Sequence, residues 1–500
     1  MKKKIFVFTL LTFFAKIFAF GRELFLSYYY GASEISDVFL LSMTIPLTIF
    51  GFVSTGITSG FIPLFHQIKE NRSSEEALLF CSRITNFILL ICMGFIIVYY
   101  VFAEKLLRIF AVGFSDETMS KAIAFTNYSI WAILAIALSA IFTSYLQIND
   151  QVNITAISQI PQNIGILITI ILSVVIDNVM VLPVGFVISS FSQTCFLLFF
   201  CIRTGYRYTI AFSFWDQYVH SFLIKLGMLT ISSSILQINT LIDRTLATSV
   251  RSGGLSLFEY AGTINNLFMG LTIIPISTAL YPQLARSCGD NIVFSRIVAD
   301  GIKMFIIIMI PLSFFVVAFS REVVTAIYGR GEFGVEEISA TAGIVVCYSL
   351  GLVAYAIREL LSKAYYACGD AKTPMVNASI ALMLNIVLNL IFVKILGLNG
   401  LALATTISAV LMTFMLWKSK KNEVILSKGN RILITATLSV IASFIGILIS
   451  KFLFDKILVL IHHNFFSLAV SGIIFAVIYL SISTLIGVFN IEDVKKILKK

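Results

Sequence analysis

Apolar runs of about 20 residues recur along the whole chain, and they restrict its fold more than any other feature. Each run can cross the hydrocarbon core once as a helix, because every backbone N–H and C=O in hydrocarbon needs a partner within its own segment. The runs are too long and too evenly apolar for barrel strands. Apolar residues make up 58% of the 500 residues and charged residues 12%, whereas soluble proteins average about 45–50% and about 25%. We therefore predict an all-α, polytopic membrane protein with about 14 transmembrane helices.

The basic residues indicate how these helices are oriented. Most of the 36 Lys and Arg residues fall in connections on one side if the N-terminus is placed inside, and cytoplasmic connections are the ones enriched in Lys and Arg. This excess holds for an even number of crossings, so both termini are expected in the cytoplasm. The formal net charge of +10 is spread thinly over an apolar chain. Nucleic acid is therefore not expected as a partner.

The sequence also indicates an internal duplication. A shift of 219 residues places Asp37–Phe65 on Ser256–Leu284, so that Pro63 meets Pro282. The shift contains six expected crossings, and an even number makes the repeats parallel, with a pseudo-two-fold axis along the membrane normal. We expect two six-helix lobes followed by two further helices and a basic cytoplasmic tail. These parts comprise residues 1–219, 220–428 and 429–500.

Four basic residues are predicted to lie inside membrane spans: Lys16, Arg22, Arg244 and Arg358. A charge at the bilayer centre costs about 2.5–3.5 kcal/mol on insertion scales, so such side chains usually face a wet cavity or a partner. Each could instead reach an interface, and an acidic residue adjoins each of the three arginines. For any one of these residues a place in a cavity and a purely structural place are equally well supported. The four residues together favour a polar cavity inside the bundle.

Motifs for catalysis or metal binding do not fit this architecture. Gly329–Gly334 matches G-x-G-x-x-G by letter, but it lies between two expected spans and not between a strand and a soluble helix. The chain has no P-loop sequence and no G-x-S-x-G, and its four histidines lack metal-ligand spacing. We expect no cofactor. The seven cysteines are scattered without a C-x-x-C pair, and we expect them to be reduced.

Short segments with recognisable residues are spread over most of the chain. They are Lys16–Glu23, Tyr30–Phe39, Gly60–Phe65, Gln237–Asp243, Ile327–Phe333, Ala364–Pro374 and Gly397–Thr405. Together they resemble the MurJ/MviN family of lipid II flippases. The resemblance implies the fold of the multidrug/oligosaccharidyl-lipid/polysaccharide exporter superfamily, with two six-helix lobes around a cationic cavity and two more helices that form a lipid-facing groove.

The same resemblance implies a transporter of the bacterial inner membrane and not an enzyme. Its cargo would be the undecaprenyl-diphosphate-linked peptidoglycan precursor, moved to the outer leaflet by alternating access for cell-wall biogenesis. The implied partners are the lipid-linked glycan and membrane lipids, and we expect a monomer. The chain has no P-loop motif for ATP hydrolysis, so a gradient of a coupling cation, the membrane potential or a downstream reaction would supply the driving force.

The resemblance places head-group-binding residues at Lys16, Arg22, Glu23 and Asp37, and intramembrane position adds Arg244 and Arg358 as candidates. Arginine suits a diphosphate because it can donate two parallel hydrogen bonds, whereas lysine acts as a point charge. Lys replaces the family's usual Arg at the first of these positions, and Glu replaces the usual Asp at the third.

Two further departures bear on the cargo. The chain has Phe50-Gly51 where many relatives carry Arg-Arg, and Gly262-Thr263 where they carry Asp-Arg. Whether Arg244 and Arg358 replace the missing charge is open. Lipid II stays the expected cargo, and the losses suggest one alternative, another undecaprenyl-linked oligosaccharide such as an O-antigen, teichuronic or capsule unit. A membrane-embedded glycan-processing enzyme is a more distant alternative.

Overall fold

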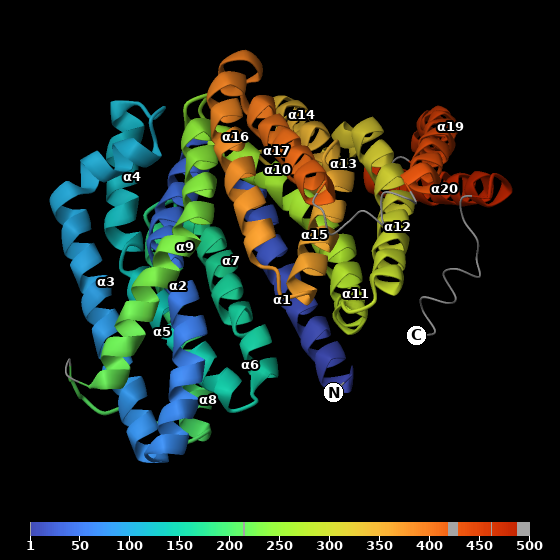
Figure 1. Ribbon diagram of the computed structural model, residues 1–500. Helices are drawn as coiled ribbons and strands as arrows, with labels where there is room; N and C mark the ends of the chain where they lie inside the picture. The colour runs from blue at the N-terminus through green and yellow to red at the C-terminus, as the bar shows by residue number, and fades with distance from the viewer. Residues whose placement is uncertain (1, 214–215, 419–428, 462, 488–500) are drawn as a thin grey trace. The chain divides into compact units, whose positions relative to one another are not determined.

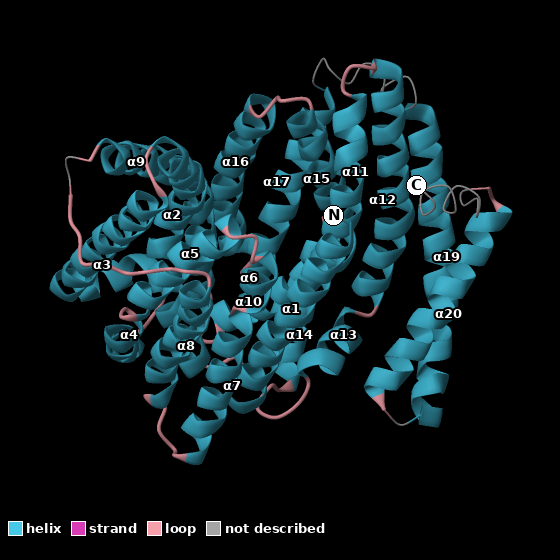
Figure 2. Cartoon of the chain, turned by 90° about the horizontal axis from the view of Figure 1, so that it is seen from below, coloured by secondary structure: helices cyan, strands magenta, loops and turns pink. Residues whose placement is uncertain are grey.

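The computed structural model describes residues 2–213, 216–418, 429–461 and 463–487, and these residues form helices and turns without a strand (Figures 1 and 2). The all-α prediction is confirmed. The chain forms two compact units. Unit 1 contains Met1–Ser256 and Gly331–Phe333, and unit 2 contains Leu257–Arg330 and Gly334–Lys500.

Unit 1 is built around α2, which packs against α3, α4, α5, α8 and α9. Figure 1 shows α2 and α9 side by side along much of their length. Buried aromatic side chains fill the space between them, and Phe61 stacks on Phe80 while Phe80 meets Phe222 edge to face. The helices of this unit are α1 (Lys2–Tyr30), α2 (Glu34–Asn71), α3 (Ser74–Phe110), α4 (Asp116–Ser129), α5 (Ala132–Ile148), α6 (Val152–Ile157), α7 (Gln159–Val175), α8 (Val181–Arg203) and α9 (Gln217–Thr248).

Serine side chains start three of these helices. Ser33, Ser73 and Ser115 each accept a hydrogen bond from the backbone N–H three residues later. Acidic residues follow each serine within the first helical turn. A hydroxyl cap and nearby negative charge both stabilise a helix N-terminus. The polar breaks between apolar runs thus fix where α2, α3 and α4 begin.

Unit 2 packs α12 against α11, α15 and α19, and α17 against α14, α15 and α16. The last two helices, α19 and α20, lie beside each other and contact α12 (Figure 2). The elements are α10 (Gly254–Phe268), the π-helical turn η1 (Met269–Ile273), α11 (Ile274–Ser287), α12 (Asn291–Ala318), α13 (Ser320–Tyr328), α14 (Val335–Ser349), α15 (Leu352–Ala367), α16 (Lys372–Leu396), α17 (Leu398–Lys418), α19 (Gly429–Ile461) and α20 (Asn464–Leu485). The first residues of α10, up to Ser256, belong to unit 1.

Within the described residues, 10 helical stretches are long and apolar enough to cross a bilayer. Two bent pairs raise the number to 12: α4 with α5, bent by 42°, and α14 with α15, bent by 44°. The long helices α1 and α9 lie outside this set, and they carry three of the four predicted intramembrane cations. The count of fourteen stays a prediction.

The lobe boundary expected from the sequence lies between residues 219 and 220, whereas the compact units divide between Ser256 and Leu257. The difference is α9, which packs along α2 and so belongs to unit 1. The division into two six-helix lobes stays a prediction, because a compact unit is not the same thing as a repeat.

The expectation that all seven cysteines are reduced is wrong in this structure. Cys288 and Cys368 form a disulfide, with their Cα atoms 5.5 Å apart. Packing of α11 against α15 brings the ends of these two helices together, although the cysteines are separated by 80 residues. Spacing along the chain therefore gave no indication of the pair. The remaining cysteines are free thiols.

Candidate functional site

Five of the six predicted site residues lie in unit 1, on three helices. Lys16, Arg22 and Glu23 are on α1, Asp37 is in the first turn of α2, and Arg244 is in the last turns of α9. Arg358 is on α15 of unit 2. The candidate site of unit 1 therefore depends on α1, α2 and α9.

Two basic side chains of α1, Lys16 and Arg22, differ in their exposure and in their contacts. The Lys16 side chain is exposed. An Arg22 Nη atom lies 3.4 Å from Glu23 Oε1, and both side chains keep a fifth to a quarter of their surface exposed. A partly exposed ion pair contributes little to stability, so it leaves the Arg22 guanidinium available to a stronger anionic partner.

Arg244 is tied to α2. Its Nη1 donates a hydrogen bond of 2.9 Å to the Thr44 hydroxyl. The site also contains a polar side chain near the position of the missing family arginines, because a Cβ on Gly51 would lie 3.1 Å from the amide carbon of Gln237. There is no room for an arginine at Gly51 unless Gln237 moves. In the sequence Gln237 stands out only as the first residue of a segment that resembles the family, and nothing in the sequence distinguishes Thr44.

Asp37 makes a different kind of contact. Only 1% of its surface is exposed, and its Oδ1 accepts hydrogen bonds from the Ser256 backbone N–H (2.7 Å) and from the Ser256 hydroxyl (2.8 Å). The two residues are 219 residues apart, which is the shift that aligned the proposed repeats. Asp37 therefore ties the start of α2 to the start of α10. A charged acceptor with two donors makes stronger hydrogen bonds than a neutral one.

Four glycines surround this contact at one end of unit 1, which we call the glycine end. They are Gly31, Gly113, Gly253 and Gly331. A Cβ at Gly331 would overlap the backbone oxygen of Tyr28, the residue whose carbonyl accepts the N–H of Glu332 at 2.9 Å. A Cβ at each of the other three would also overlap backbone atoms of a segment distant in sequence. The backbones pack here at a distance that only glycine permits.

Arg358 is the predicted site residue of unit 2. Its guanidinium carbon lies 5.5 Å from the centre of the Tyr355 ring, within the range of a cation–π contact. The adjacent Glu359 pairs with Lys363, at 3.2 Å. The Lys363 ammonium also donates to the hydroxyls of Ser277 and Thr278, both at 2.9 Å. Lys363 thus links α15 to α11, and Glu359 pairs with it from the same helix.

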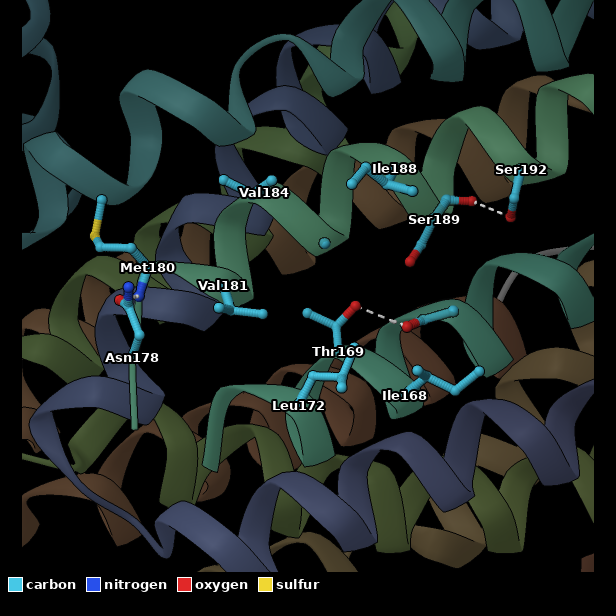
Figure 3. A pocket seen from close by; sticks show the side chains of 12 residues that line it. Ile168, Thr169, Leu172, Asn178, Met180, Val181, Val184, Ile188, Ser189 and Ser192 are labelled. Atoms are coloured by element: carbon cyan, nitrogen blue, oxygen red, sulfur yellow. Dashed lines mark hydrogen bonds between the residues drawn. The ribbon is translucent and has the colours of Figure 1, made fainter. Parts of the chain in front are cut away.

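A cavity of about 460 Å³ lies between α7 and α8 in unit 1 (Figure 3). Two of its polar side chains bond their own helices, with Thr169 donating to the Gly165 carbonyl and Ser192 to the Ser189 carbonyl. No charged side chain lines it. The cavity therefore suits an apolar occupant and is not the predicted cationic site.

The described residues contain no group of three His, Cys, Asp or Glu side chains placed to hold a metal ion. The chemistry that this site offers is anion binding by guanidinium groups and a buried acceptor that joins two helices. Such an arrangement can bind and release a charged head group without breaking a bond.

Comparisons with known proteins agree on one family. A family model described as "Lipid II flippase MurJ" matches residues 26–457. The "Probable lipid II flippase MurJ" of Borreliella burgdorferi is 28% identical over 84% of this chain and 82% of the relative. The protein of the same description from Thermotoga maritima is 26% identical over 82% and 83%.

Solved structures give the same result. "Lipid II flippase MurJ, inward closed conformation" matches with a TM-score of 0.81 and 25% identity, over 96% of this chain and 98% of that chain. An inward-facing multidrug resistance transporter of the MATE family matches with a TM-score of 0.67 and 14% identity, over 84% and 94%. The second likeness shows the fold alone.

Proposed function

The chain belongs to the MurJ family, and on that premise we propose that it is a lipid II flippase of the bacterial inner membrane. It carries the undecaprenyl-diphosphate-linked peptidoglycan precursor from the cytoplasmic to the outer leaflet, with both termini in the cytoplasm. The observation that carries the proposal is the match of the flippase family model to residues 26–457. The cargo crosses without covalent chemistry, so the protein needs a cavity that opens to each side in turn.

The arginines of unit 1 supply the charge that a diphosphate requires. Arg22 and Arg244 are both half-buried. Arg22 pairs with Glu23 and Arg244 donates to the Thr44 hydroxyl, and a phosphate oxygen could take the place of either partner. Guanidinium groups bind phosphate with two parallel hydrogen bonds, which gain strength where water is scarce. Lys16 adds an exposed point charge on the same helix as Arg22.

We further propose that the glycine end is the outer gate. Two residues related by a two-fold axis touch each other only beside that axis, and Asp37 bonds Ser256, its counterpart in the proposed repeat. Gly113 and Gly331 are 218 residues apart, and the residues they meet, Thr248 and Tyr28, are 220 apart. These separations match the repeat, so each half would place one glycine loop on the other half. Opening toward the outer leaflet requires these contacts to separate.

Conditional depletion tests the proposed cargo. In a strain with no second lipid II flippase, depletion of this chain should make lipid II accumulate in the cytoplasmic leaflet, and the wild-type gene should reverse the effect. Arg22→Ala should fail to rescue at normal protein level, and Arg22→Lys should rescue in part because it keeps the charge. An unchanged leaflet distribution during depletion would exclude lipid II as the cargo.

A second cargo has one specific observation in its favour. Gln237 lies over Gly51, where many relatives carry an arginine pair, so the chain has a neutral polar group near that place. This change suits a different head group on the same carrier lipid, such as an O-antigen, teichuronic or capsule unit. Failure to rescue a strain that lacks its lipid II flippase, together with rescue of a strain that lacks an oligosaccharide flippase, would favour this alternative.

A further inference from the structure

A loop joins α8 to α9 in unit 1, and we call its described residues 204–213 the connector. The connector runs along α3 (Figure 2) and is hydrogen-bonded to it. The Asn86 amide donates to the Ala211 carbonyl at 2.8 Å and accepts from the Tyr208 hydroxyl at 2.6 Å. The Thr209 N–H donates to the Ser82 hydroxyl at 3.2 Å. The connector is thus part of the folded unit and holds its side chains in defined positions.

The charge pattern of α3 places the connector at a membrane surface. Between Arg83 and Glu104 this helix has 20 residues without a charge, and about 20 helical residues span the hydrocarbon core. Arg83 therefore marks one edge of the core. The connector is bonded to Ser82 and Asn86, on either side of that edge. It lies at the level of the lipid head groups.

The exposed side chains of the connector are partly apolar and partly basic, as expected at the level of the lipid head groups. Ile210 is 84% exposed, and Phe212 and Tyr208 are about half exposed. Arg203, the last residue of α8, and Arg207 are exposed as well. An exposed isoleucine at the head-group level contacts acyl chains, and arginines there contact lipid phosphates.

The arginines at this end of unit 1 fall into two groups. Arg83 and Arg72 lie 2.9 Å and 3.4 Å from the Asp216 carboxylate, so a carboxylate already neutralises part of their charge. Among the described residues, neither Arg203 nor Arg207 has a carboxylate within ion-pair distance. Arg203 lies over the Phe199 ring at 4.3 Å, which fixes its guanidinium beside an exposed aromatic side chain. Two cations are thus left for an external anion.

We infer that Arg203, Arg207 and Ile210 form a binding surface for anionic phospholipids of the bilayer. The two arginines supply the positive charge for the phosphodiester, and Ile210 supplies an apolar contact for the first part of an acyl chain. The surface is separate from the predicted head-group site, whose residues are on α1, α2, α9 and α15. The inference does not depend on the cargo, because it needs only a bilayer with anionic lipid.

Native mass spectrometry of the purified full chain tests this surface, with phosphatidylglycerol and phosphatidylcholine of identical acyl chains as probes. The wild type should retain phosphatidylglycerol in preference to phosphatidylcholine. Each basic residue near an anionic surface contributes about fivefold, so R203Q/R207Q should weaken phosphatidylglycerol binding about thirtyfold. R203K/R207K should keep most of the preference, because the ammonium group still carries the charge.

The double variant K105Q/K394Q is the matched control. It removes the same charge from two exposed lysines, one of them at the other end of α3, and it should bind phosphatidylglycerol like the wild type. Equal binding of the two lipids by the wild type, or an unchanged preference in R203Q/R207Q, would overturn the inference. Undecaprenyl diphosphate is the competitor that distinguishes the source of the phosphate. If it displaces phosphatidylglycerol from the wild type at lower concentration than from R203Q/R207Q, the surface binds the cargo lipid and the inference is wrong.

Discussion

The two ends of unit 1 are held together by different physical means. At the glycine end, backbones from distant segments touch because Gly31, Gly113, Gly253 and Gly331 lack a side chain. At the connector end, long side chains converge on one carboxylate, that of Asp216. Backbone contact depends on shape and is lost after a small displacement. Attraction between charges falls slowly with distance and is screened by salt.

This difference suits different tasks. A contact that is either complete or absent is appropriate for a gate, because a partly open gate would leak. An ion pair tolerates small changes in distance, so it is appropriate for a contact that must persist while helices move. We therefore expect substitutions at the glycine end to affect transport and substitutions at the connector end to affect stability.

Gly331→Ala should have the largest effect. Gly331 has φ +65°, and a Cβ there would overlap the Tyr28 backbone. The left-handed conformation and the overlap together should cost about 2–4 kcal/mol, which is enough to reduce the closed population about a hundredfold. The variant should be present in the membrane but should not rescue the depletion strain.

Gly205→Ala is the matched control for this prediction. Gly205 has φ +93°, but no atom lies within 4 Å of its added Cβ. Only the conformational cost of about 1 kcal/mol applies, so rescue should be retained. Equal loss of rescue in both variants would show that backbone strain alone inactivates the protein, and the outer contacts would not be the reason.

Asp37→Ala should rank second. Removing the carboxylate leaves the Ser256 N–H without its buried acceptor, whereas the Ser256 hydroxyl keeps the Gly253 carbonyl as an acceptor. An unsatisfied buried group costs about 1–3 kcal/mol. We expect transport to fall at least about tenfold, measured as the rate at which labelled lipid II reaches the outer leaflet of vesicles. Asp37→Asn keeps an oxygen acceptor and should lose much less. If both variants lose the same activity, the charge of Asp37 matters for head-group binding and its hydrogen bonds to Ser256 do not.

Much of the fold could be predicted from the sequence because the membrane leaves few choices. Apolar runs must become helices, so most of the expected crossings correspond to helices or bent pairs. The shift of 219 residues aligned Asp37 with Ser256, and these two residues are in contact. Periodicity could not show that α9 packs along α2, because helix packing depends on side-chain shape on both partners.

The site was harder to predict than the fold. Intramembrane cations stand out in the sequence because of their cost in hydrocarbon. Arg22, Arg244 and Arg358 are half-buried in helices, and their role in head-group binding stays a prediction. Their partners are ordinary residues such as Thr44 and Tyr355, whose role depends on contacts between helices. The glycine contacts were missed for the same reason, since a glycine in a loop has many uses and only the neighbouring backbone identifies which one applies.

Asp216→Ala should have a moderate effect at the connector end. Asp216 accepts from the N–H of Tyr218 at 2.8 Å as the cap of α9, and it also pairs with Arg83 and Arg72. Loss of the cap should cost about 1 kcal/mol and loss of the ion pairs about 1 kcal/mol more. Asp216→Asn keeps a capping oxygen and should lose only the second part. Thermal unfolding in detergent at low and high salt measures both, and the Asn variant should approach the wild type at high salt. A deficit in Asp216→Asn that is independent of salt would contradict a charge-based anchor.

Ser256→Ala should have the smallest effect, although it changes the residue that bonds Asp37. The substitution removes the hydroxyl donor but keeps the backbone N–H, so Asp37 Oδ1 retains its 2.7 Å bond. One hydrogen bond to a charged group contributes about 1.5–3 kcal/mol, but the carboxylate keeps the backbone N–H as a partner and only one oxygen atom is removed, so the net loss should be about 1 kcal/mol. Transport measured with labelled lipid II should fall less than about fivefold, well above the rate of Asp37→Ala. If Ser256→Ala were as inactive as Asp37→Ala, the hydroxyl itself would be essential, and the glycine end would depend on side-chain chemistry instead of backbone contact.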